Sequence, residues 1–168
     1  MTTFDSRFTE ADQLYANAIA ILQNGDVAKA AGLFAAITAR FPDYGKAWNE
    51  LGNILFNHLN SPEEAADCFQ KAMEAEPGLA SAYLGYAEVL FVLERYAEAN
   101  AIVNQAMEVK GVRKDLAWMR SALIMESQSR FDEAIETYKK AILTSFSEED
   151  ISRCEKGISR CNIKKKYQ

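Results

Sequence analysis

The chain has 168 residues, a formal net charge of -5 and a pI near 5.0, with 26% charged and 49% hydrophobic residues. These values suit one compact domain or a short solenoid, and the presence of only three prolines favours long helices. They argue against nucleic acid as a general partner, because phosphate affinity comes mainly from Lys and Arg.

Residues 1–10 are expected to form a short N-terminal leader. They are acidic and polar and have no apolar core, so they do not resemble a signal peptide. Thr9 is followed by an acidic first turn and marks a weak helix start, so we expect the first helix to begin there. No apolar run is long enough for a bilayer, so we expect no membrane insertion.

The strongest pattern in the chain begins at Trp48. It has the spacing W-x2-L-G-x2-L and is followed by Ala65-x3-Phe69 and by Pro77. The same positions recur 34 or 35 residues apart. The position of Trp48 is also held by Leu14, Tyr83 and Trp118, that of Ala65 by Ala30, Ala99 and Ala134, and that of Phe69 by Phe34, Val103 and Tyr138.

This pattern resembles the tetratricopeptide repeat, which has the same marked residues on a period of about 34. The resemblance implies an all-α fold, a right-handed superhelix of helix–turn–helix repeats. Four copies fit residues 11–44, 45–79, 80–114 and 115–146. Single-residue insertions in the turn 58–62 and near 111–115 explain the spacings of 35.

The segment 147–163 is predicted to be a ninth helix that caps the solenoid. It begins at Ser147, and its apolar residues recur at i, i+3, i+7 and i+10, which places Ile151, Cys154, Ile158 and Cys161 on one stripe. Residues 151–168, including a basic tail at 164–168, hold six Lys or Arg and one Glu. We interpret this charge as a solvated helix end. The alternative is a weak electrostatic contact with a membrane, a nucleic acid or an acidic partner.

No residue pattern in the sequence indicates a catalytic, metal-binding or cofactor-binding site. The chain has one histidine, His58, and no glycine-rich phosphate loop, so we expect no metal, no cofactor and no enzymatic activity. The three cysteines, Cys68, Cys154 and Cys161, include no CxxC pair and are predicted to be buried, reduced side chains. This cysteine usage favours a cytoplasmic location.

In tetratricopeptide-repeat proteins the first helix of each repeat lines a concave groove, and the resemblance therefore implies groove positions here. Our candidate peptide-groove residues are Tyr15, Ile19, Asn49, Glu50, Asn53, Phe56, Leu84, Glu88, Phe91, Met119, Arg120 and Leu123, and the same counting adds Glu126. Asn49 and Asn53 are either solvated or placed to pair with an extended peptide backbone. The apolar members either anchor a ligand or pack between helices.

One subgroup of the family grips the carboxylate tail of heat-shock chaperones with Lys, Asn and Arg at set positions. Only Asn53 and Arg120 match that set, and Glu88 is close in register. We therefore expect no binding of a heat-shock-chaperone carboxylate tail. The expected groove is apolar and mildly acidic.

These observations favour a protein–protein interaction module, an adaptor or scaffold that binds a peptide or protein ligand. One alternative is a dedicated chaperone for one secreted or assembling client. Another is a structural repeat protein that associates with itself as a homo-oligomer.

Overall fold

The computed structural model describes residues 3–167, with side chains from Thr9 onward, and this part of the chain contains nine α-helices and no strand. The helices are α1 (Thr3–Gln23), α2 (Val27–Arg40), α3 (Gly45–Asn57), α4 (Pro62–Ala75), α5 (Ala80–Val92), α6 (Tyr96–Glu108), α7 (Lys114–Ser127), α8 (Phe131–Thr144) and α9 (Glu148–Lys164). A short 3-10 helix, η1 (Lys165–Tyr167), follows α9. None of these helices combines the length and the apolar character needed to cross a membrane.

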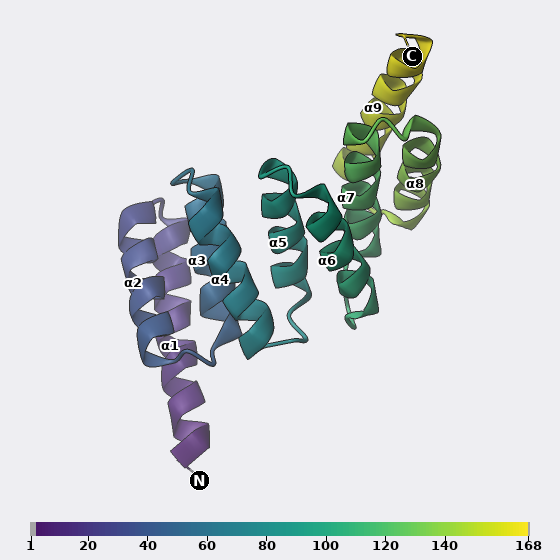
Figure 1. Cartoon of the computed structure of the whole chain (residues 1–168). Coiled ribbons are helices and arrows are strands. Elements are labelled where there is room, and N and C mark those ends of the chain that lie inside the picture. Colours follow the sequence, from purple (N-terminus) through teal and green to yellow (C-terminus); the bar gives the residue numbers. More distant parts are fainter. Residues whose placement is uncertain (1–2, 168) are drawn as a thin grey trace.

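Consecutive helices form an elongated array, with α1 near one end and α9 at the other (Figure 1). The pairs α1–α2, α3–α4, α5–α6 and α7–α8 pack together, and each pair contacts the next. Contacts also join α3 to α5, α5 to α7 and α7 to α9. The odd-numbered helices from α3 to α9 therefore form one continuous layer of the array.

Each pair packs through small and large residues at equivalent positions. The odd helices bury Ala18, Gly52, Ala87 and Ala122, and the even helices bury Ala30, Ala65, Ala99 and Ala134. Four positions further along the even helices, Phe34, Phe69, Val103 and Tyr138 are each at most 1% exposed. A Cβ added at Gly52 would lie 3.1 Å from the Phe69 ring, which shows how closely the helices approach.

The turn inside each pair has the same backbone signature. Gly25, Asn60, Glu94 and Ser129 have positive φ, and the N–H of the next residue bonds back to the preceding helix. Within the pairs, the turns 24–26, 93–95 and 128–130 have three residues, whereas the turn 58–61 has four. Between the pairs, the connection 109–113 from α6 to α7 has five residues. Both predicted insertions are therefore confirmed, and the turns follow the left-handed helix-ending motif.

One predicted helix start needs correction. The helix α1 already includes Thr3, so residues from Thr3 to Glu10 are helical and the expected start near Thr9 is wrong. Ser61 stands at the N-cap of α4, but its hydroxyl donates to the Leu59 carbonyl at 3.4 Å and makes no cap bond. By contrast, the Ser147 hydroxyl accepts from the Asp150 N–H at 3.3 Å, as a capping serine does.

The helix α9 packs its predicted apolar stripe against α7 and α8. Cys154 and Cys161 are 1% and 0% exposed, and Ile158 packs in the same cluster with Tyr138. The burial predicted for the three cysteines is confirmed, since Cys68 is also buried.

Candidate functional site

Two adjoining hollows lie where α5, α7 and α9 meet. The larger, of about 400 Å³, is lined by Glu88 of α5, by Met119, Arg120 and Leu123 of α7, by Tyr138 of α8, and by Arg153, Lys156 and Arg160 of α9. The smaller, of about 230 Å³, is lined by Phe91, Leu123, Glu126, Ser127, Arg160 and Lys164. Because Leu123 and Arg160 line both, we treat the hollows as one surface and call it the α5–α7–α9 groove.

Helical spacing explains why these side chains share the groove. Arg153, Lys156, Arg160 and Lys164 follow one another at i, i+3, i+7 and i+11, which places them on one stripe of α9. Met119 and Leu123 stand four residues apart on α7. Met119 is 7% exposed and belongs to the core, while Leu123 and Phe91 are half-buried, so the floor of the groove is apolar.

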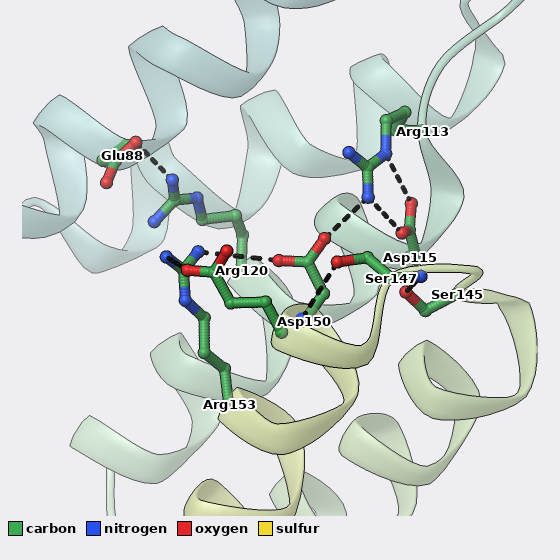
Figure 2. Close-up of polar contacts among 9 residues, drawn as sticks. Glu88, Arg113, Asp115, Arg120, Ser145, Ser147, Asp150 and Arg153 are labelled. Carbon is green, nitrogen blue, oxygen red and sulfur yellow. Dashed lines mark hydrogen bonds and ion pairs between the residues drawn. The ribbon is translucent and has the colours of Figure 1, made fainter.

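Several charged side chains of the groove form ion pairs within the protein. Arg120 of α7 pairs with Glu88 of α5 (Figure 2). Arg153 pairs with Glu149 at 2.5 Å and lies 3.5 Å from Asp150, both on its own helix. Within the described part of the chain, the Lys156 ammonium has no ion-pair partner.

Glu126 fixes the C-terminal half of α9 against α7. Its carboxylate, only 5% exposed, accepts hydrogen bonds from Arg160 at 2.9 and 3.0 Å, from Lys164 at 3.0 Å and from the Tyr138 hydroxyl at 3.0 Å. Burial opposes its ionisation, but these hydrogen bonds outweigh burial and lower the pKa of Glu126. The repeat register predicts Glu126 as a groove position. It lines the smaller hollow, but its hydrogen bonds are all made to side chains of the protein itself.

Arg113 fixes the N-terminal end of α9. Its guanidinium donates to Asp115 at 2.5 Å and to Asp150 at 2.7 Å, which bridges the first turns of α7 and α9 (Figure 2). The hydrogen bond from Arg113 lowers the pKa of Asp115, which is 7% exposed. The position of the α9 cations is therefore set by contacts at both ends of the helix.

The predicted groove residues divide into two groups. Glu88, Phe91, Met119, Arg120 and Leu123 line the α5–α7–α9 groove. The remaining seven lie outside it, mostly toward the N-terminal end: Tyr15, Ile19, Asn49, Glu50, Asn53, Phe56 and Leu84.

Most of the second group is engaged within the protein. Tyr15 packs edge-on against Phe34 and Tyr44, with ring centroids 5.7 Å apart in each case, and Ile19 joins the same core cluster. Phe56 and Leu84 also pack against buried clusters. For these residues, packing between helices is the alternative that the structure favours.

Asn49 is not accessible to a ligand as predicted, whereas Asn53 is partly exposed. Asn49 is 4% exposed and donates to Glu50 at 3.0 Å, and its Oδ1 has no partner among the described residues. Asn53 donates to the other Glu50 oxygen at 3.4 Å. A buried Asn49 cannot pair with a peptide backbone without moving, so its predicted role needs correction.

The α5–α7–α9 groove differs in charge from the mildly acidic groove that the first helices of the repeats predict. Five cations face two carboxylates, because α9 contributes Arg153, Lys156, Arg160 and Lys164. The sequence predicts a solvated helix end for these residues, and all four are exposed, but they also line the groove. The regular spacing of Arg153, Lys156, Arg160 and Lys164 in the sequence is the signal that would place them on one face of α9.

Three family models, each described as a tetratricopeptide repeat, match residues 15–80, 58–124 and 116–146. The chain belongs to the tetratricopeptide-repeat family. Tetratricopeptide-repeat (TPR) proteins are generally protein–protein interaction modules and are typically not enzymes. Together the three matches extend over every helix pair from α1–α2 to α7–α8.

Solved structures share the fold at low identity. A thermophilic TPR protein of Thermus thermophilus, TTC0263, has a TM-score of 0.72 and 22% identity over 88% of this chain and 81% of its own. PilF of Pseudomonas aeruginosa has a TM-score of 0.80 and 16% identity, over 96% and 72%. YrrB, a TPR protein with an unusual peptide-binding site, has a TM-score of 0.73 and 16% identity, over 98% and 84%. No curated protein matches the sequence.

Proposed function

We propose that this TPR protein is an adaptor or scaffold that holds a peptide or protein segment against its concave surface. In this account α1 to α8 are four repeats of a right-handed superhelix, and α9 is the cap. The observation that carries the proposal is the α5–α7–α9 groove, whose partly exposed apolar side chains, Phe91 and Leu123, lie beside charged side chains. Binding sites commonly combine an apolar floor with a few placed polar groups.

The two side chains that match the family's carboxylate-binding set are poorly placed to hold a heat-shock-chaperone tail. Arg120, one of two residues that match the carboxylate-binding set, is paired with Glu88. Asn53, the other, donates to Glu50. Both matching side chains are therefore already engaged with a carboxylate of the protein itself, and we propose that such a tail does not bind.

A random peptide library displayed on phage tests the groove. Peptides selected on the full chain should lose binding to the double variant Phe91→Ala, Leu123→Ala, because both side chains line the smaller hollow. The matched control removes two exposed apolar side chains outside the groove, Leu59→Ala and Leu143→Ala. Circular dichroism melting shows that each variant is folded. Selected peptides that bind both double variants equally would refute the groove as the binding site.

A further inference from the structure

The α5–α7–α9 groove is basic in a chain that is otherwise acidic. Residues 151–168 carry six Lys or Arg and one Glu, so with a total of -5 the first 150 residues have a net charge of -10. In the folded protein, four of these late cations line the groove. An acidic partner would therefore be attracted to this surface and repelled by the rest of the molecule.

Several of the α9 cations keep hydrogen-bonding capacity for a ligand. Lys156 is exposed and has no ion-pair partner among the side chains of residues 9–167. Arg160 directs Nε and Nη2 at Glu126, which leaves Nη1 free of that carboxylate, and its side chain is 47% exposed. Arg153 is 57% exposed and is paired only with acids of its own helix. Charged donors of this kind form the stronger hydrogen bonds with carboxylates.

We propose that the groove binds an acidic segment of a partner protein, with carboxylates on Arg153, Lys156 and Arg160 and an apolar side chain on Leu123. This inference rests on the proposed function and names the chemistry of the ligand. The apolar floor beside the cation stripe distinguishes such a segment from a polyanion without apolar groups. A nucleic acid that extends past the stripe would meet the acidic surface of the earlier repeats.

Fluorescence anisotropy with the full chain tests the proposal. The probe is a fluorescein-labelled peptide of alternating glutamate and leucine with an amidated C-terminus, which removes the terminal carboxylate. Its counterpart has glutamine in place of each glutamate and should bind about tenfold more weakly. Lys156→Glu should weaken binding of the acidic peptide by about fivefold or more.

Lys29→Glu is the matched control, because Lys29 is exposed on α2 and the change in net charge is identical. It should leave the affinity within about twofold. Four results would overturn the proposal: no binding of the acidic peptide, equal binding of the glutamine peptide, equal effects of the two Lys→Glu variants, or equally tight binding of a short single-stranded DNA. A chain that dimerises in sedimentation experiments and loses the dimer on adding the peptide would assign the groove to a second copy instead.

The library experiment separates this inference from the proposed function. If selected peptides depend on Phe91 and Leu123 but bind the Lys156→Glu variant normally, the proposed function stands and the acidic ligand is wrong. If no peptide depends on Phe91 and Leu123, both fail.

Discussion

Gly157 allows α9 to lie against Tyr138, and Gly157→Ala should disturb that contact. A Cβ at Gly157 would be 2.6 and 2.8 Å from two Tyr138 ring carbons, closer than carbon atoms pack. The ring cannot easily withdraw, because Tyr138 is 1% exposed and its hydroxyl donates to Glu126 at 3.0 Å. Either α9 moves outward or this hydrogen bond is strained.

The change in the free energy of unfolding is the balance of one stabilising and two destabilising contributions. Replacing glycine by alanine inside a helix stabilises it by about 1 kcal/mol. Overpacking a filled core costs about 1–3 kcal/mol, and loss of a hydrogen bond adds about 1 kcal/mol. The gain and the lost hydrogen bond roughly cancel, so we expect Gly157→Ala to lower the free energy of unfolding by about 1–3 kcal/mol.

Gly32→Ala supplies the matched control, since Gly32 lies in α2 and an added Cβ meets no atom within 4 Å. It should raise the free energy of unfolding by up to about 1 kcal/mol. Urea denaturation gives both values, and hydrogen exchange should show lost protection concentrated in α9 for Gly157→Ala. If the two variants are stabilised equally, the close approach of α9 to Tyr138 is wrong.

Three further predictions concern Glu126, Glu94 and the cysteines. Glu126→Gln should lower the free energy of unfolding near pH 7 by about 1–2 kcal/mol, less than for a fully buried pair because Arg160 and Lys164 are half exposed. The pKa of Glu126 in the folded protein lies below its ordinary 4.5, so the stabilisation by its carboxylate is complete above pH 4.5 and is lost as the pH falls through the lower folded pKa. The free energies of unfolding of the variant and the parent should therefore converge in acid, and a difference that stays constant with pH would contradict this prediction. Glu94→Gly should raise the free energy of unfolding by about 0.5–1 kcal/mol in thermal melts, because Glu94 has φ of 59°, whereas Ala97→Gly in the following helix should lower it. Burial raises the pKa of Cys68 to about 11, so iodoacetamide at pH 8 should label it only on unfolding, and rapid labelling of the native protein would disprove its burial.

The sequence predicts the repeat scaffold well because its signals are local and recur. Ala65 and Phe69 stand four residues apart on one helix, and the same small and large pair returns in each copy. Helix geometry therefore places these residues on one face, and their recurrence predicts that this face is buried. The turn insertions are equally local, since each adds one residue between two recognisable helix ends.

The groove was harder to predict because it depends on how helices from different repeats face one another. Arg120 lies at a family groove position, but its pairing with Glu88 requires the contact between α5 and α7. Lys156 belongs to no repeat, and it enters the groove because the apolar stripe of α9 and the contacts of Arg113 and Glu126 dock α9 against α7 and α8. Asn49 has the right register and is nevertheless buried.

The most direct test of peptide binding in the groove is an amide NMR titration of the full chain with a peptide selected from the library. We predict that chemical-shift changes concentrate on α5, α7 and α9, around Phe91, Leu123 and Lys156. Chemical-shift changes confined to the even-numbered helices α2, α4, α6 and α8 would contradict peptide binding in the groove.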